Sequence, residues 1–372
     1  MQKTASLVIV GGGVMGCSLA YHLTQLGESQ VVLLERGALC SGETAKSGGF
    51  VQTHWTSPHE VKLIHWSRQF FAEWAEPCLF RPIGYLHTTG SEREPVVRQV
   101  HDMLLALGFE SHWLGPREVK KLQPLLRVDD LVGGAYEPQS GWVDPIRTTH
   151  FFGDAARQRG AHLHEGVRVL QIAHRDGKVQ GVETDRGFIS SPRVVLAVGP
   201  WTSQLHPTPG VPLPLIAKRG QVCYMTRPGG LPRTELTFYD EVTGLYTHPD
   251  GDTNLVGLDW HFEPVWGPDY YEREIDSDYL EAAHQALSHR FPSLSLARPV
   301  RGVVGLYDFT PDGHPIVDGP LGLEGYYVAA GFSGAGFKSS PALGLGLAEM
   351  ILHGQPRTVN LDFLKLSRFD KP

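Results

Sequence analysis

Cysteine is scarce in this sequence. Four cysteines occur among 372 residues, at positions 17, 40, 78 and 223, and no two of them form a Cys-x-x-Cys pair. Zinc sites and dithiol redox centres use closely spaced cysteines, so neither is expected. We expect four free thiols in a protein of a reducing compartment. Because no carboxylate or cysteine lies at a spacing that matches the histidine pairs His162/His164 and His284/His289, we expect no metal site.

Long apolar runs are also missing. No stretch approaches the ~18 apolar residues that a membrane-spanning helix needs, so we expect no membrane span. The first apolar run, Leu7–Val10, leads directly into glycines. A signal peptide would have a longer apolar stretch followed by a cleavage site. The expected location is therefore the cytoplasm.

Positive charge is not in surplus. Lysine and arginine total 33, against 40 for aspartate and glutamate, which gives a formal net charge of −7. A nucleic-acid partner is not expected, because binding a phosphate polymer takes a basic surface. Hydrophobic residues make up 41% of the chain and charged residues 20%, which is typical of a globular protein.

Glycine, in contrast, is abundant, with 43 residues. The opening of the chain predicts a strand over Leu7–Val10, a helix over Val14–Leu26 and a strand over Val31–Glu35. This order is a β-α-β unit, which predicts a parallel, Rossmann-like sheet.

The turn between the first strand and helix carries a dinucleotide motif. Gly11, Gly13 and Gly16 fit the pattern GxGxxG, in which the glycines allow a tight turn, a close approach to pyrophosphate and close helix–strand packing. The start of the helix also offers N–H groups to phosphate. Glu35 ends the next strand, where a carboxylate can accept the hydroxyls of a ribose. The motif predicts a dinucleotide but does not separate NAD from FAD.

Two later glycine turns favour FAD. A predicted strand over Val194–Val198 runs into Gly199, which suits a second pass of backbone beside the same cofactor. Near the C-terminus we expect a helix over Pro341–His353 with Ser340 as its cap. The positive end of that helix, together with Lys338, would stabilise the negative charge of a reduced flavin.

The pattern predicts two domains, both discontinuous in sequence. One is an α/β, Rossmann-like FAD-binding domain, and the other is an α+β substrate domain built mainly on an antiparallel sheet. The expected ranges are 1–84, 142–218 and 302–372 for the first domain, and 85–141 and 219–301 for the second.

Three segments resemble the D-amino acid oxidase superfamily, and specifically its sarcosine oxidase and glycine oxidase branch. They are Val8 to Gly16, Gly305 to Pro315 and Gly331 to Lys338, and the resemblance covers nearly the whole chain. It implies an FAD domain, a sheet-based substrate domain, and oxidation of an N-alkyl or free amino acid to an imine by hydride transfer to flavin N5. Water would then hydrolyse the imine.

The motif and the resemblance together assign a set of residues to FAD. They are Gly11, Gly13, Val14, Met15, Gly16, Glu35, Arg36, Lys46, Ser47, Gly48, Gly49, Val167, Ala197, Gly199, Trp201, Gly334, Ala335, Gly336, Phe337 and Lys338. Ala335 replaces a histidine of the monomeric sarcosine oxidases. Gly305 falls where those enzymes carry the cysteine bonded to the flavin, so the resemblance implies non-covalent FAD.

The resemblance also implies a substrate pocket. Tyr246 and His261 match a pocket tyrosine and histidine, and Tyr307 matches a second pocket tyrosine. With Lys338, they are the predicted catalytic residues. We expect Tyr246 and His261 to orient the substrate, His261 to tune its proton, and Lys338 to stabilise the reduced flavin.

One departure from the family concerns the substrate carboxylate. The family usually carries an arginine near the end of the stretch over residues 45–52, where this chain has Gln52. Burying a carboxylate without a cation costs several kcal/mol. Lys338, Arg301 and Lys46 are the candidates to replace the arginine, or else the substrate is not a simple amino acid.

The electron acceptor stays open. An oxidase would reduce O2 to H2O2. The lysine that assists oxygen reduction in sarcosine oxidases falls near Leu255–Gly257, where this chain has none. That departure favours a dehydrogenase that passes electrons to a partner subunit or another acceptor. A non-catalytic, FAD-bound assembly subunit is a third reading, and the oligomeric state stays open. The acidic balance disfavours a tRNA-modifying flavoprotein.

Overall fold

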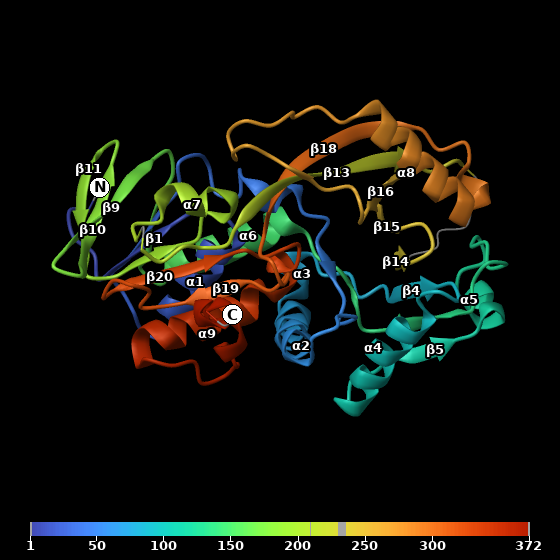
Figure 1. Ribbon diagram of the computed structural model, residues 1–372, viewed down its shortest axis with the longest axis horizontal. Helices are drawn as coiled ribbons and strands as arrows, with labels where there is room; N and C mark the ends of the chain where they lie inside the picture. The colour runs from blue at the N-terminus through green and yellow to red at the C-terminus, as the bar shows by residue number, and fades with distance from the viewer. Residues whose placement is uncertain (1, 209, 230–235, 371–372) are drawn as a thin grey trace.

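The computed structural model describes residues 2–208, 210–229 and 236–370. Figure 1 shows two sheets side by side, one near the chain termini and one formed by the middle of the sequence. The elements fall into these two groups, and the expected fold class, with one parallel sheet and one mostly antiparallel sheet, is confirmed.

The first sheet has six strands. Their order is β19 (Ile316–Asp318), β20 (Tyr326–Ala330), β12 (Val194–Leu196), β1 (Leu7–Val10), β2 (Val31–Leu34) and β8 (His162–His164). All pairings are parallel except β19 with β20. The strands are almost entirely apolar, because both faces of the sheet are covered. The β-α-β unit predicted from the opening residues is therefore present.

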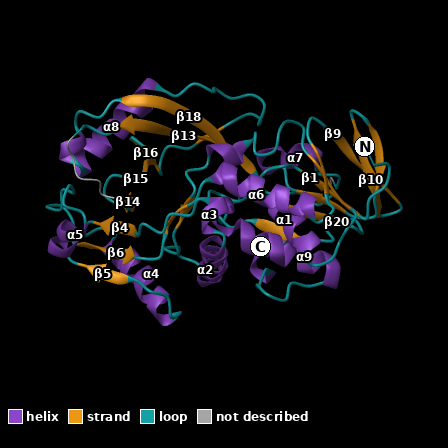
Figure 2. Ribbon diagram, turned by 180° about the vertical axis from the view of Figure 1, so that it is seen from behind, coloured by secondary structure: helices purple, strands orange, loops and turns teal. Residues whose placement is uncertain are grey.

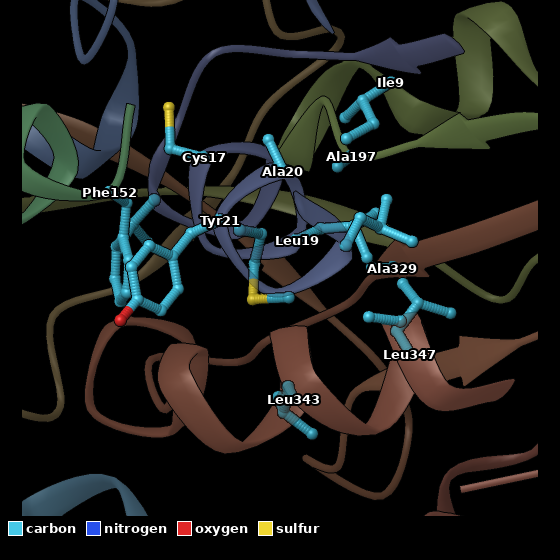
Figure 3. Packing of buried hydrophobic residues seen from close by; sticks show 14 of the residues in the cluster. Ile9, Cys17, Leu19, Ala20, Tyr21, Phe152, Ala197, Ala329, Leu343 and Leu347 are labelled. Carbon is cyan, nitrogen blue, oxygen red and sulfur yellow. The ribbon is translucent and has the colours of Figure 1, made fainter. Parts of the chain in front are cut away.

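Helices cover one face of this sheet. They are α1 (Val14–Gln25), α2 (Pro58–Glu73), α3 (Ala75–Cys78), α6 (Pro145–Gln158) and α9 (Gly336–His353). Figure 2 shows α1, α6 and α9 gathered together. Figure 3 shows Leu19 of α1 on the side of the sheet residue Ala329, and Tyr21 of α1 beside Phe152 of α6. The opposite face is covered by a small antiparallel sheet of β9 (Val169–Arg175), β10 (Lys178–Thr184) and β11 (Gly187–Ser190).

The second sheet has nine strands in the part of the chain that the structure describes. Along its main path lie β17 (Glu263–Pro264), β13 (Ile216–Thr226), β16 (Thr253–Leu258), β15 (Leu245–Asp250), β14 (Thr237–Asp240), β4 (Tyr85–Thr89), β6 (Gly133–Glu137) and β5 (His112–Leu114), and β18 (Pro299–Phe309) pairs with β13. Among the strands of this sheet in the described ranges, only β14 and β4 pair in parallel. The apolar cluster of this sheet takes side chains from α5 (Pro116–Leu122) and α8 (Ser277–Arg290), and α4 (Glu94–Ala106) packs beside β4, β5 and β6.

Two long strands connect the regions of the two sheets. β13 and β18 each contain 11 residues and pair with each other over nearly their whole length. Both run across the domain boundaries expected at residues 218/219 and 301/302. The domain ranges therefore stay a prediction, whereas the two sheets themselves are clear. The other short elements include β3 (Phe50–Val51), β7 (Gly141–Trp142) and α7 (Thr202–Leu205).

The last long helix begins earlier than expected. We predicted a start at Pro341 with Ser340 as the cap, but α9 starts at Gly336 and Pro341 lies inside it. Proline cannot donate an N–H to the carbonyl four residues before it, which is that of Phe337. The Ser340 hydroxyl donates to this carbonyl instead, at 2.9 Å. Because of the earlier start, Lys338 lies in the first turn of α9.

Helices α1 and α9 pack with very little space between them. A Cβ added to Gly344 would lie 2.2 Å from Ser18 Oγ and 2.9 Å from Ser18 Cβ. We therefore expect Gly344→Ala to lower the free energy of unfolding by about 1–3 kcal/mol, the usual cost of overpacking, as measured by urea denaturation. The double variant Ser18→Ala/Gly344→Ala should lose less than the sum of the two single variants, because Oγ is the nearest obstacle. Strictly additive losses would contradict this explanation.

All four cysteines are buried free thiols, as predicted. Within the described ranges, no helix has both the length and the apolar character needed to cross a bilayer. The same part of the chain contains no group of three or more histidine, cysteine or carboxylate side chains arranged for a metal ion.

Candidate active site

A cavity of about 1290 Å³ lies between the two sheets. Its walls come from the turn after β1, the short helix η1 (Glu43–Lys46), β3, the turn after β12, strands β4, β13, β15 and β18, and the start of α9. Pockets for single small molecules usually measure ~300–1,000 Å³. This cavity is large enough for a dinucleotide together with a further small molecule.

The glycine turn after β1 forms one end of the cavity. A Cβ on Gly11, which has a φ of +114°, would lie 2.3 Å from Ala197 O, and a Cβ on Gly16 would lie 1.9 Å from Gly11 O. The turn can therefore form only with glycine at these positions. Gly13, the N-cap of α1, gives the helix no side-chain cap. Since Gly11 and Gly13 line the cavity, the positive end of α1 opens onto it, and that end suits a phosphate.

Glu35 lies beside this turn. One carboxylate oxygen accepts the N–H of Gly12 and the other that of Gly37, both at 2.7 Å. Each carboxylate oxygen can accept more than one hydrogen bond, so Glu35 keeps acceptor capacity on the cavity side. The geometry fits the two hydroxyls of an adenosine ribose.

A segment of the second sheet region reaches across the cavity to the nucleotide turn. Asp269 accepts a hydrogen bond from Trp201 Nε1 at 2.8 Å and lies 3.6 Å from the Arg36 guanidinium. That guanidinium also stacks on the Trp201 ring, 4.1 Å from its centroid. Further along, the hydroxyl of Tyr271 lies 3.0 Å from Lys46 Nζ.

The middle of the cavity is formed by the loop after η1 and by β18. Lys46 Nζ pairs with the Glu43 carboxylate at 3.0 Å, and Glu43 accepts the N–H of Leu306 at 2.6 Å. A Cβ on Gly305 would lie 3.0 Å from that carboxylate, so little space remains for a larger residue. Among the described lining residues there is no cysteine.

The start of α9 closes the other end of the cavity. Lys338 is only 6% exposed, lines the cavity and places its Nζ 4.6 Å from the centre of the Trp55 ring. Burial lowers the pKa of Lys338 to about 8, so the cation is easily deprotonated. Nearby, the buried Asp308 accepts the N–H of Gly331 at 2.6 Å, and burial raises its pKa to about 6.

Aromatic side chains of the second sheet face this end. Tyr246 of β15 and Tyr307 of β18 lie close enough for their hydroxyls to interact, and burial raises the pKa of both hydroxyls, which therefore stay protonated. Gln52 lines the same cavity. The pocket is thus mainly neutral and aromatic, with Lys338 as its cation.

Most of the predicted site residues line the cavity. Of the residues assigned to FAD, the exceptions are Gly16 and Ala335, which lie behind the lining. Gly16 acts through the shape of the turn, and Ala335 is the N-cap of α9.

Two predicted substrate residues do not reach the cavity. β16 ends at Leu258, so His261 lies beyond the strand, with its ring 5.2 Å from that of Tyr279 on α8. The fifteen-residue spacing from Tyr246 does not pair the two side chains, because the residue opposite Tyr246 is Gly257. Arg301 stacks on Tyr224, and its side chain is 58% exposed. Neither residue contributes to the cavity.

The cavity also includes polar side chains that sequence reasoning missed. They are His54, Tyr85, His87, Tyr239 and Asp259. His87 lies 3.0 Å from both the Tyr85 hydroxyl and Glu241, and its ring is 4.2 Å from that of His54. Tyr85 and His87 are two residues apart in β4, so both side chains lie on one face of the strand. This spacing could have been recognised in the sequence. His54 follows a two-residue strand and gave no such pattern.

The arrangement fits FAD. A helix end with glycine at its N-cap, a ribose acceptor and a long cavity suit a dinucleotide. The second helix end beside Lys338 suits the part of a flavin that becomes negative on reduction.

Comparison with known proteins agrees with this geometry. The family model "FAD dependent oxidoreductase" matches residues 6–350. Mitochondrial sarcosine dehydrogenase of Mus musculus is 31% identical over 96% of this chain and 40% of its own length, so this chain spans about two-fifths of that relative. Sarcosine oxidase subunit beta of Arthrobacter sp. is 26% identical, over 99% of this chain and 92% of its own.

Solved structures share the fold. L-proline dehydrogenase from P. horikoshii matches with a TM-score of 0.92 at 24% identity, over 100% of this chain and 99% of its own. Glycine oxidase from Geobacillus kaustophilus matches with a TM-score of 0.87 at 23% identity, over 99% of each chain. The resemblance inferred from three sequence segments is thereby confirmed, and the chain belongs to the FAD-dependent oxidoreductase family.

Proposed function

We propose that this protein oxidises the carbon–nitrogen bond of an N-substituted or free amino acid to an imine. One observation carries the proposal: a cavity joins the dinucleotide turn to an aromatic pocket that is lined by the buried Lys338. The names of similar proteins support the same class, since they include dehydrogenases of sarcosine and dimethylglycine and an oxidase of 4-methylaminobutanoate.

FAD would be held along the whole cavity. The end of α1 would bind its pyrophosphate and Glu35 its ribose, while Gly48, Gly49 and the start of α9 would contact the flavin. The bound cofactor supplies hydride acceptance, which is chemistry that no side chain of the protein provides.

The pocket would favour the uncharged form of the amine over its ammonium form. Only an uncharged amine has a lone pair from which to form the double bond as hydride leaves. The protonated hydroxyls of Tyr246 and Tyr307 stabilise an ammonium ion poorly, and burial disfavours any charge. Lys338 would bind the substrate carboxylate, and it is better placed than the other candidates because Lys46 is already paired with Glu43 and Arg301 lies outside.

The acceptor of the electrons is a separate part of the proposal. Oxygen reduction to H2O2 is one possibility. The resemblance to sarcosine oxidases implies a lysine in the stretch Leu255–Gly257. In this chain the stretch is buried and contains no cationic residue. This observation favours a dehydrogenase that uses another acceptor or a partner subunit. Stoichiometric, rapid H2O2 formation in air would support the oxidase, and slow reoxidation the dehydrogenase.

The central test is an anaerobic titration of the FAD-loaded protein with a panel of amines. We expect at least one of sarcosine, N,N-dimethylglycine, L-proline, glycine and 4-methylaminobutanoate to bleach the long-wavelength flavin band. If primary, secondary, tertiary and cyclic amino acids all fail, the proposal is wrong. A non-catalytic, FAD-bound subunit would then be favoured. One relative that is 30% identical is named as a regulatory subunit, the pyruvate dehydrogenase phosphatase regulatory subunit.

A further inference from the structure

A fully buried carboxylate lies behind the substrate end of the cavity. Glu137 ends β6 and is 0% exposed. Its Oε2 accepts three hydrogen bonds, from Thr53 N at 2.8 Å, Thr53 Oγ1 at 2.7 Å and Ser140 Oγ at 2.6 Å. All three donors converge on one oxygen, so the other oxygen is left for a different partner.

That other oxygen faces a histidine of the cavity wall. Oε1 of Glu137 lies 3.9 Å from Nδ1 of His54, and within the described part of the chain neither atom has a hydrogen-bond partner. Leaving two buried polar atoms unpaired is costly, and a small approach of the two groups would pair them. His54 Nδ1–H would then donate to Glu137 and fix the tautomer in which Nε2 is an acceptor.

Of the two neighbouring histidines His54 and His87, it is His54 that has a ring nitrogen available to the substrate. It lines the cavity beside His87, but both nitrogens of His87 already have partners, the Tyr85 hydroxyl and Glu241. Because Nδ1 of His54 points at Glu137, Nε2 is the nitrogen left for the cavity. Burial is the main cause that holds the pKa of His54 well below its usual range, and the nearby His87 and His101 lower it further. The resting ring is therefore uncharged.

We propose that His54 is a catalytic base that removes the proton of the substrate ammonium group, and that Glu137 is its positioning residue. The inference rests on the proposed function. The N–H bond of the ammonium breaks, its proton moves to Nε2, and the electron pair stays on the amine nitrogen. The resulting imidazolium is stabilised by the Glu137 carboxylate through Nδ1–H, as in other carboxylate–histidine pairs.

The other charged groups around the pair define its pH behaviour. Burial lowers the pKa of Lys338 of α9 and of Arg68 of α2, and the negative charge of Glu137 opposes this lowering. Burial raises the pKa of Tyr85 of β4, and Glu137 raises it further. His87 of β4 and His101 of α4 add to burial in lowering the pKa of His54. The Lys338 cation repels a substrate ammonium and so favours transfer of its proton. Deprotonation of the substrate is thereby assisted from two sides of the pocket.

The first test is the pH profile of anaerobic flavin reduction by the most effective amine of the panel. We expect His54→Asn to slow reduction by about 10²–10⁴-fold at neutral pH. The rate should then recover about tenfold per pH unit as free amine accumulates in solution. Glu137→Gln should move the pH of half-maximal rate. The matched control Thr53→Val, which removes a hydrogen bond to the same carboxylate, should leave that pH in place.

The second test does not depend on turnover. With the flavin chemically reduced, the holoenzyme binds the amine without oxidising it, and ¹⁵N NMR of labelled histidine reports ring protonation. We expect the amine to shift the ¹⁵N signal of one histidine ring, whose Nε2 accepts a hydrogen bond from the substrate N–H, in the wild type but not in His54→Asn. Betaine, which has the carboxylate but no N–H proton, should shift none.

The outcomes separate the two proposals. If the wild-type flavin is reduced by an amine but His54→Asn keeps the wild-type profile and the histidine signal, the base assignment is overturned and the proposed function stands. If Glu137→Gln leaves the pH of half-maximal rate unchanged, as Thr53→Val is expected to do, then Glu137 has a structural role alone and its positioning role is overturned. If no amine reduces the wild-type flavin, both proposals fail.

Discussion

Replacing Lys338 with methionine is expected to weaken binding of a carboxylate-bearing amine by about two to four orders of magnitude while FAD stays bound. Lys338 is buried in the pocket, and removing one partner of a buried ion pair costs about 3–5 kcal/mol, because the other charge is left without compensation. The dissociation constant can be measured by spectral titration, with the flavin content of the variant as the check on folding.

The same contact predicts a pH dependence. The lysine pKa is lowered to about 8, so the cation is present below this pH and is lost as the pH rises through it. Affinity for the carboxylate substrate should therefore fall above about pH 8. Lys338→Arg should remove this alkaline loss, because a guanidinium stays charged. An amine without a carboxylate, such as N-methylpropylamine, should show no alkaline loss of this origin, and unchanged affinity of Lys338→Met for the amino acid would contradict the assignment.

Replacing Gly16 with alanine is expected to abolish FAD binding. The added Cβ would lie 1.9 Å from the carbonyl oxygen of Gly11, a backbone atom that cannot move without opening the turn. The start of α1 would shift away from the site where phosphate is expected to lie. We expect a colourless protein that stays colourless with excess FAD, measured by absorbance and by quenching of FAD fluorescence.

A control separates this effect from general damage. A Cβ added to Gly210 would meet nothing within 4 Å, so Gly210→Ala should bind FAD normally. Glu35→Gln provides a milder variant that keeps the turn and should lower FAD affinity without preventing folding, as judged by circular dichroism. A Gly16→Ala protein that purifies yellow with full FAD content would refute this account of the turn.

The sequence predicted the first β-α-β unit to within a residue or two, because each of its boundaries has a local cause. The strands are short apolar runs, the helix begins after a glycine turn, and Gly27, with a φ of +95°, follows its end. The start of α9 was predicted five residues too late. A proline normally marks a first turn, and the side-chain hydrogen bond from Ser340 that lets it lie deeper in the helix is a local detail that the pattern did not reveal.

The candidate site was only partly predictable, for a different reason. The nucleotide residues come from contiguous turns, so a motif locates them. The substrate end is assembled from loops and strands far apart in sequence. Which residues line it depends on the register in which the strands pair. Tyr246 lies opposite Gly257 rather than His261, and one further turn after β16 removed His261 from the pocket. His54 became visible only when β6 brought Glu137 beside it.

The pairing of β13 with β18 has a mechanical consequence. At about 3.3 Å per residue, each 11-residue strand extends roughly 35 Å, and the pair passes from one sheet region to the other as a hydrogen-bonded ribbon. Such a ribbon resists bending far more than a single-chain linker does. The two halves are therefore not expected to swing apart as a hinge, and small molecules should enter and leave through movements of surface loops alone.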